Sequence, residues 1–154
     1  MICDRYSSII TGREVVRLGV AVALIDQSQR LLLELRSDVR MWGITGGRLD
    51  PGETPPECGC REIKEETGIN LHPNDLYFFD VYANPLEGRV LQYPDNRVHL
   101  IDIVYVAYID SSVPLVLSEE SVSLEFYSAS SIPDVIVPPA KQPVFDLIAR
   151  GFVA

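Results

Sequence analysis

The stretch that most constrains the fold is GGRLDPGETPPECGCREIKEETGI, residues 46–69, because it carries the start and stop signals of one helix. Thr54 and Glu57 fit a capping box, in which each side chain bonds the backbone N–H of the other residue. Gly68 supplies the residue that commonly ends a helix in the left-handed conformation. These signals predict a helix over residues 55–67. The glycines before it allow a tight turn and a close approach of backbone to a ligand.

At about 100° per residue, this helix has an apolar side and a strongly acidic side. Ile63 lies on the apolar side, whereas Glu62, Glu65 and Glu66 share the other side with Arg61. Most charged helix faces are simply exposed to solvent. However, Glu62 and Glu66 are like charges at i,i+4, which costs about 0.2–0.5 kcal/mol, and one arginine does not neutralise three carboxylates. A bound Mg²⁺, which takes oxygen ligands and engages substrate phosphates, would resolve the conflict.

The rest of the chain predicts several strands around this helix and a second helix near the C-terminus. Runs of branched and aromatic residues predict the strands, and apolar residues at helical spacing predict the second helix. We see no repeat or linker, so we expect one domain over residues 1–154. Its class is α+β, or a three-layer sandwich with a mixed sheet. The expected strands cover residues 15–26, 30–38, 41–47, 75–83, 97–110 and 124–133, and the expected second helix covers 141–152.

Composition limits the partners that the chain can bind. Its net charge is −9, whereas extended nucleic acid requires a broad positive surface. A small phosphate-bearing ligand remains compatible if cations bridge the like charges. The first residues, MICDRYSSII, have no charged leader before an apolar core, and the three cysteines argue against a disulfide framework. No apolar run approaches the roughly 20 residues of a membrane-spanning helix. We therefore expect a soluble, cytoplasmic protein that does not bind membranes.

Residues 47–69 resemble the Nudix box, G-x5-E-x7-R-E-U-x-E-E-x-G-U, where U is a bulky aliphatic residue. The match includes every defining position: Gly47, Glu53 and the run REIKEETGI at residues 61–69. The resemblance implies an α/β/α sandwich and a metal-dependent hydrolase that cleaves the diphosphate linkage of a nucleoside diphosphate joined to another group. It also implies Mg²⁺ or Mn²⁺ as the cofactor and a small nucleotide as the substrate.

The resemblance further implies roles for residues of the box. Glu62, Glu65 and Glu66 would be metal ligands together with the carbonyl of Gly46. Arg61 would orient a glutamate of the box. The box therefore supplies three of the four expected metal ligands and, in Arg61, Glu62 and Glu65, most of the expected catalytic residues.

Other assignments lie at or beyond the edges of the box. The general base would be Glu62 or a glutamate of a later loop, where the sequence offers Glu119 and Glu120 and we assign Glu120. Arg36 and Trp42 flank the box and Gly47 opens it, so we expect these three to contact the substrate. Simpler alternatives are a solvated loop for Glu120, a surface arginine, a core tryptophan and a plain glycine turn.

Alternative functions remain open from the sequence. The main one is a Nudix-like module that binds a nucleotide for regulation without cleaving it, and the other is a purely structural domain with a charged helix. The intact box favours the hydrolase. Pro85, which follows the box at a spacing common in ADP-ribose pyrophosphatases, also fits a simple turn. The substrate, ADP-ribose or a nucleoside triphosphate among others, and homodimerisation are therefore left open.

Overall fold

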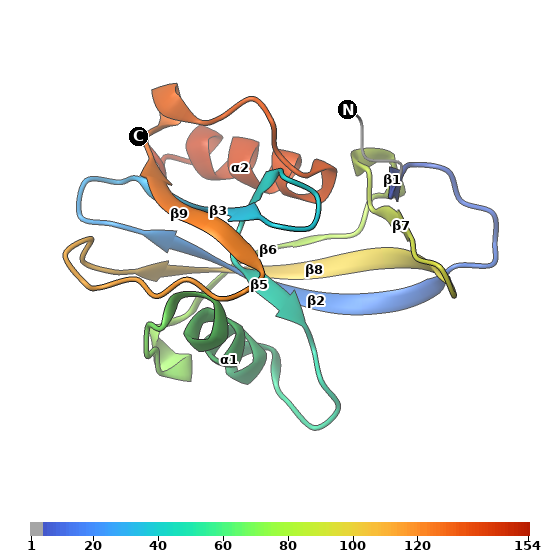
Figure 1. The fold of residues 1–154 in the computed structure, drawn as a ribbon, viewed down its shortest axis with the longest axis horizontal. Coiled ribbons are helices and arrows are strands. Elements are labelled where there is room, and N and C mark those ends of the chain that lie inside the picture. Colours follow the sequence, from blue (N-terminus) through green and yellow to red (C-terminus); the bar gives the residue numbers. More distant parts are fainter. Residues whose placement is uncertain (1–4) are drawn as a thin grey trace.

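The computed structural model describes residues 5–154, so that Cys3 and the start of the N-terminal segment considered above lie outside it. The sheet lies between helix α1 (Pro55–Thr67) on one face and helix α2 (Pro138–Ala149) on the other (Figure 1). This arrangement confirms the expected α+β sandwich. The strands are β1 (Tyr6–Ser7), β2 (Val15–Ile25), β3 (Leu31–Arg36), β4 (Trp42–Gly43), β5 (Gly46–Arg48), β6 (Tyr77–Tyr82), β7 (Val90–Gln92), β8 (Arg97–Tyr108) and β9 (Ser121–Tyr127).

The centre of the sheet is the parallel pair β2–β8, in which Val15–Ile25 pairs residue for residue with Val98–Tyr108. Strands β6 and β7 run antiparallel to β8, and β1 continues beyond β7. On the other side of β2 lie β5 and β3, both antiparallel, and β3 also carries β4 and β9. The sheet is therefore mixed, as the sequence predicts. The short strands β1 and β7 were not predicted, because two or three residues carry no detectable periodicity.

The single strand expected at residues 41–47 is in fact two strands with different partners. Strand β4 pairs with β3, whereas β5 pairs with β2. The chain changes partner at the buried Thr45, whose hydroxyl donates to the carbonyl of Val22 at 3.0 Å and whose own carbonyl accepts from the N–H of Val22 at 2.8 Å. As a result, Gly46 and Gly47 form a short strand against the middle of the sheet.

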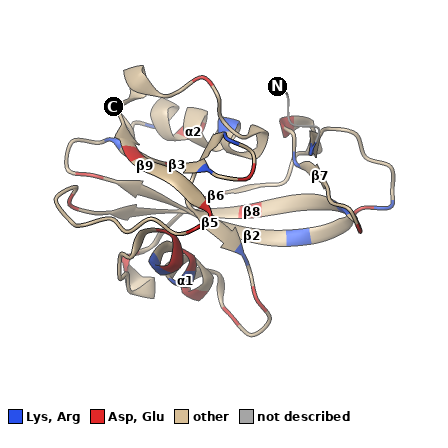
Figure 2. Ribbon diagram, viewed as in Figure 1, with Lys and Arg blue, Asp and Glu red and all other residues tan. Residues whose placement is uncertain are grey.

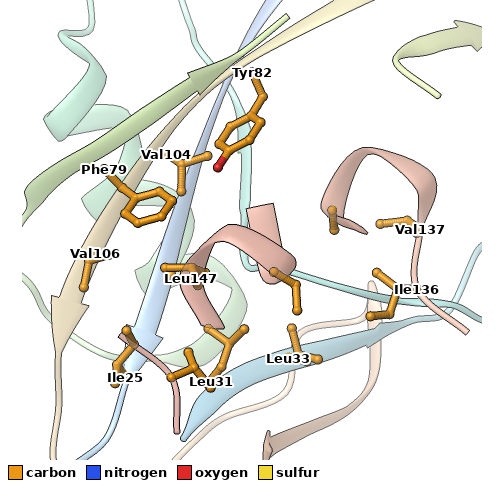
Figure 3. Packing of buried hydrophobic residues seen from close by; sticks show 14 residues of the cluster. Ile25, Leu31, Leu33, Phe79, Tyr82, Val104, Val106, Ile136, Val137 and Leu147 are labelled. Carbon is orange, nitrogen blue, oxygen red and sulfur yellow. The ribbon is translucent and has the colours of Figure 1, made fainter. Parts of the chain in front are cut away.

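Side chains alternate along the strands, so each face of the sheet packs on its own helix. On the α2 side, Leu147 lies among residues of several strands, including Ile25, Leu31, Phe79 and Val104 (Figure 3). On the α1 side, Ile63 packs with Val22, Leu24, Leu32 and Leu76. Gly59 allows α1 to lie close to the sheet, because a Cβ there would lie 2.9 Å from both Leu76 and Val22.

Helix α2 begins at Pro138, earlier than the predicted residue 141. Proline is tolerated in the first turn, where the N–H would have no partner within the helix. Pro143 lies inside the helix and offers no N–H to the carbonyl of Pro139, four residues before it. That carbonyl instead accepts a hydrogen bond from Nη2 of Arg89 at 2.7 Å. Within residues 5–154, no helix is long and apolar enough to cross a membrane.

Candidate active site

Helix α1 begins and ends where its sequence predicts, and this fixes the position of its carboxylates. The N–H of Glu57 donates to the Thr54 hydroxyl at 3.4 Å, and the N–H of Thr54 donates to the Glu57 carboxylate at 3.2 Å. Gly68 closes the helix at φ 77° and donates to the carbonyl of Lys64 at 3.0 Å. The acidic face of this helix stands out in Figure 2.

Arg61 ties the loop before α1 to the carboxylates of the helix. Its Nε and Nη2 donate to Glu53 at 2.6 and 2.9 Å, and its Nη1 donates to Glu62 at 2.8 Å. Its Nη2 also donates to the carbonyl of Arg48 in β5, at 3.0 Å. The hydrogen bond from Arg61 lowers the pKa of Glu53 to about 2. One guanidinium thus fixes Glu62 relative to the short strand of glycines.

The carboxylate of Glu62 lies directly against the backbone of Gly47, where the position of the carboxylate leaves no room for a Cβ. Burial raises the pKa of Glu62, Arg61 opposes that effect, and the charges of Glu65 and Glu120 add to it. Glu120 belongs to the exposed turn before β9. It lies near enough to Glu62 for its charge to raise the pKa of that carboxyl. The structure brings this loop glutamate to the box.

Glu66 lies deeper, in a buried carboxyl pair with Glu34 of β3. The two residues are 5% and 3% exposed. Burial, and then the nearby Glu34, raise the pKa of Glu66 to about 10, which favours the protonated form of Glu66 at neutral pH. Ser121 donates to Glu34 at 2.7 Å, and the N–H of Gly46 donates to Glu66 at 3.3 Å. Sequence reasoning missed Glu34, although one acid inside the apolar run LLLELR was a signal.

Glu65 differs from the other two glutamates, because its side chain is 58% exposed and only reaches Nη1 of Arg61 at 3.4 Å. Among residues 5–154, no three His, Cys, Asp or Glu side chains stand in an arrangement that would hold a metal ion. The chemistry of the donors nevertheless suits a hard cation. The carboxylates of the half-buried Glu62 and the buried Glu66 converge on Gly47 and Gly46. Burial raises the pKa of both groups, and a bound cation would compensate their charge.

A pocket of about 260 Å³ opens beside Gly46 and Gly47. Arg36 lines it, although its Nε also donates to Asp38 at 3.1 Å. Trp42 is not part of the lining, since its ring packs edge-on against Tyr127 with the ring centroids 5.1 Å apart. The charged residues of the lining are four arginines and one aspartate: Arg5, Arg17, Arg36, Arg48 and Asp102. The pocket lining is therefore positively charged, whereas the whole chain has a net charge of −9.

Asp102, on β8, is the acid of this pocket, and sequence reasoning missed it. Its Oδ2 accepts from Nη1 of Arg89 at 2.9 Å, and Arg89 is fully buried. Burial raises the pKa of Asp102, and Arg89 opposes this effect. An acid in the middle of the apolar run RVHLIDIVYVAYID was a signal in the sequence. No such signal marks its partner Arg89 in the sequence, because the residues next to it do not indicate that this arginine is buried.

Comparisons with known proteins agree with this geometry. A family model described as the NUDIX domain matches residues 15–148. A putative 8-oxo-dGTP diphosphatase of Bacillus subtilis is 32% identical over 128 residues, 83% of this chain and 77% of that protein. An ADP-ribose pyrophosphatase of Methanocaldococcus jannaschii is 31% identical over 140 residues, 84% of this chain and 77% of that protein. A MutT Nudix hydrolase structure from Burkholderia pseudomallei has a TM-score of 0.69 at 24% identity, covering 86% of this chain and 98% of that chain.

The chain therefore belongs to the Nudix hydrolase family, as the box predicted. The match extends well beyond the box and includes most of the strands described above. Several other curated relatives are longer, and the chain spans less than half of their length.

Proposed function

We propose that this Nudix hydrolase is a metal-dependent pyrophosphohydrolase that cleaves the diphosphate linkage of a nucleoside diphosphate joined to another group. One observation carries the proposal. The carboxylates of Glu62 and Glu66 converge on Gly46 and Gly47, and these same glycines line the pocket that contains four arginines. The proposed metal site and the arginine-lined pocket thus both border the short strand β5.

The proposed metal ligands are Glu62, Glu65, Glu66 and the carbonyl of Gly46. Bound Mg²⁺ or Mn²⁺ would neutralise substrate phosphates and lower the pKa of a water nucleophile. The buried Glu34–Glu66 pair supports this assignment, because two carboxyls in one dry site need either a shared proton or a cation between them. Glu65 is exposed and must turn from Arg61 to take part.

The proposed catalytic residues are Arg61, Glu62, Glu65 and Glu120. Arg61 positions Glu62 through its short hydrogen bond, while its bonds to Glu53 and to the Arg48 carbonyl fix the guanidinium. We assign to Glu120 the acceptance of a proton from the attacking water, and its exposure and the effect of its charge on Glu62 support this assignment. Glu62 is the second candidate for that role.

The proposed substrate contacts are made along the pocket. Gly47 lets a phosphate approach the backbone, and Arg36 offers a guanidinium to it. Arg17 also lines the pocket and stacks on Tyr93, with its Cζ 5.0 Å from the ring centroid. The local excess of positive charge draws an anion to a protein whose overall charge would repel it. Trp42 would contact the substrate only after leaving its place on Tyr127.

The relatives indicate a nucleotide substrate but do not single out one nucleotide. One of the two relatives above is named for 8-oxo-dGTP and the other for ADP-ribose. Both are small nucleotides with a diphosphate linkage, which the arginines of the pocket suit. The second candidate is a nucleotide-binding module without catalysis, and a complete set of box residues argues against it.

The experiment is hydrolysis of a panel of nucleotides with Mg²⁺ or Mn²⁺, read as phosphate release after a coupled phosphatase. The panel contains ADP-ribose, nucleoside triphosphates, 8-oxo-dGTP and dinucleoside polyphosphates. We expect metal-dependent turnover that Glu66→Gln abolishes while the fold is retained. Glu119→Gln, an exposed glutamate beside Glu120, is the matched control and should keep full turnover. Nucleotide binding without turnover by the wild type, with either metal, would instead establish the binding module.

A further inference from the structure

The pocket contains one group that the hydrolysis of a diphosphate does not require. This group is Asp102, which lines the pocket. It lies outside the box, on strand β8, which pairs with β2. Its neighbour across the pair is Gly19, and the Oδ1 of Asp102 occupies the space that a Cβ of Gly19 would fill. The absence of a side chain at Gly19 therefore exposes this carboxylate oxygen to the pocket.

A chain of contacts holds Asp102 in this orientation. Pro143 leaves the Pro139 carbonyl without a helical partner, and Nη2 of Arg89 donates to that carbonyl at 2.7 Å. The same guanidinium donates from Nη1 to Oδ2 of Asp102 at 2.9 Å, and its Cζ lies 5.4 Å from the ring centroid of Tyr82. Arg89 thus engages one oxygen of Asp102 from behind and leaves the other directed forward.

The two oxygens of this carboxylate have different surroundings. Oδ2 is bound by Arg89, whereas no donor in residues 5–154 is bonded to Oδ1. The side chain is 18% exposed and belongs to the pocket lining. A half-buried carboxylate oxygen that no protein donor satisfies must take its hydrogen bonds from water or from a ligand in the pocket. The site is therefore preorganised to accept an N–H group.

Apolar side chains make up much of the pocket that Asp102 lines. The remaining lining includes apolar groups from the sheet and from α2: Ala21, Ile44, Leu100, Val104, Val137 and Ala140. Apolar walls pack on the faces of an aromatic base, while a single polar acceptor fixes its orientation at the edge. The arginines of the lining are then left to the phosphates, and the carboxylates near Gly47 to the cations that would bridge to them.

We propose that Asp102 is a specificity residue, whose Oδ1 accepts hydrogen bonds from the edge of the substrate base and selects a base with an amino group beside a ring N–H, as in guanine. The inference rests on the proposed function, because it assigns the base end of the same substrate pocket. A base with such an edge presents two donors to one carboxylate. A base without the amino group presents only one, so it makes one hydrogen bond fewer to the charged acceptor and binds more weakly.

The test compares guanosine and inosine 5′-triphosphates, which differ only by the 2-amino group. Dissociation constants are measured by calorimetry in chelator, where metal-dependent turnover is absent, and kcat/KM is measured with Mg²⁺. We expect the wild type to favour the guanosine nucleotide by about 10- to 100-fold, the range for a hydrogen bond to a charged group. Asp102→Asn keeps an oxygen for Arg89 but presents an amide N–H to the pocket, so this preference should vanish.

Two further variants keep the result interpretable. Gly19→Ala leaves Asp102 in the chain but places a methyl group against its Oδ1, so it should also reduce the preference. Asp95→Asn makes the same change of charge in an exposed turn and should leave the preference intact. Thermal unfolding shows whether Asp102→Asn is folded, and Gly19→Ala decides the question if it is not.

The outcomes separate the two proposals. If the wild type hydrolyses nucleotides but does not distinguish guanosine from inosine, the role of Asp102 is refuted while the proposed function stands. The same holds if both pocket variants keep the wild-type preference. If the wild type neither binds nor hydrolyses any nucleotide of the panel, the proposed function fails and the role of Asp102 fails with it.

Discussion

The buried Glu34–Glu66 pair should make the stability of the metal-free protein depend on pH, and Glu34→Gln tests this directly. In the folded protein, burial and then Glu34 raise the pKa of Glu66 to about 10 from an ordinary value of 4.5. The folded state therefore keeps a proton that the unfolded chain releases. The stability from this group is fully present below pH 4.5 and is lost as the pH rises toward 10.

The size of the effect follows from the number of protons. A difference of one bound proton changes the free energy of unfolding by about 1.4 kcal/mol per pH unit at most. Over two pH units around neutrality, Glu66 therefore accounts for a loss of up to about 2.7 kcal/mol. This is a large part of the roughly 5–15 kcal/mol by which a domain is stable. Burial also raises the pKa of Glu62, so its contribution has the same sign.

Glu34→Gln preserves the volume of the side chain and an oxygen that can accept from Ser121. It removes the like charge, and its amide N–H can donate to Glu66. The pKa of Glu66 should then fall toward its ordinary value, although burial still raises it. We expect a flatter dependence of stability on pH than in the wild type. In mildly alkaline solution the variant should be more stable than the wild type by about 1–2 kcal/mol.

The assay is urea-induced unfolding in the presence of a chelator, repeated at several pH values from mildly acidic to mildly alkaline. Glu119→Gln is the control, because it removes the same charge from an exposed turn and should reproduce the wild-type slope. If stability depends on pH with the same slope in the wild type and in Glu34→Gln, Glu34 does not raise the pKa of Glu66 and the reasoning is refuted. A variant that is less stable than the wild type across the whole range would show that Glu34 is needed as a charge.

Three further predictions address the loop, the cap and the metal. Gly47→Ala should weaken Mg²⁺ binding in calorimetry with only a small loss of thermal stability, because its methyl group displaces the carboxylate end of one side chain, Glu62. Gly46→Ala should unfold at a clearly lower temperature, because its methyl group meets the backbone of β2. Thr54→Ala should cost about 1 kcal/mol in urea unfolding through loss of the helix cap, and no loss would contradict the capping box. Mg²⁺ should raise the melting temperature more in alkaline than in acidic solution, because a cation at Glu66 displaces a proton; an equal rise at all pH values would oppose this.

Much of the site is encoded locally and was predictable. The boundaries of α1, its cap and its terminal glycine depend on contacts within a few residues, and the prediction of residues 55–67 is confirmed by the helix Pro55–Thr67. The acidic face follows from the helical period alone. The Nudix box has the same local character, which is why the family could be identified from residues 47–69 and is confirmed by the comparisons.

Other features depend on residues that only the folded sheet brings together. Glu34 meets Glu66 because β3 and α1 enclose the same buried space, and Arg89 reaches Asp102 because Pro143 frees a carbonyl of α2. Neither pairing has a fixed spacing in sequence. The two strands in place of the expected one at residues 41–47 also reflect a change of partner at Thr45.

The sequence by itself therefore determined the helix, its carboxylates and the family, because short-range capping, periodicity and motif spacing are properties of neighbouring residues. The tertiary structure decided which carboxyl is buried beside Glu66, which arginines line the pocket and which oxygen of Asp102 faces it. Burial and charge pairing are set by distances between segments that are far apart in the chain. These distances are fixed only when the sheet and both helices pack.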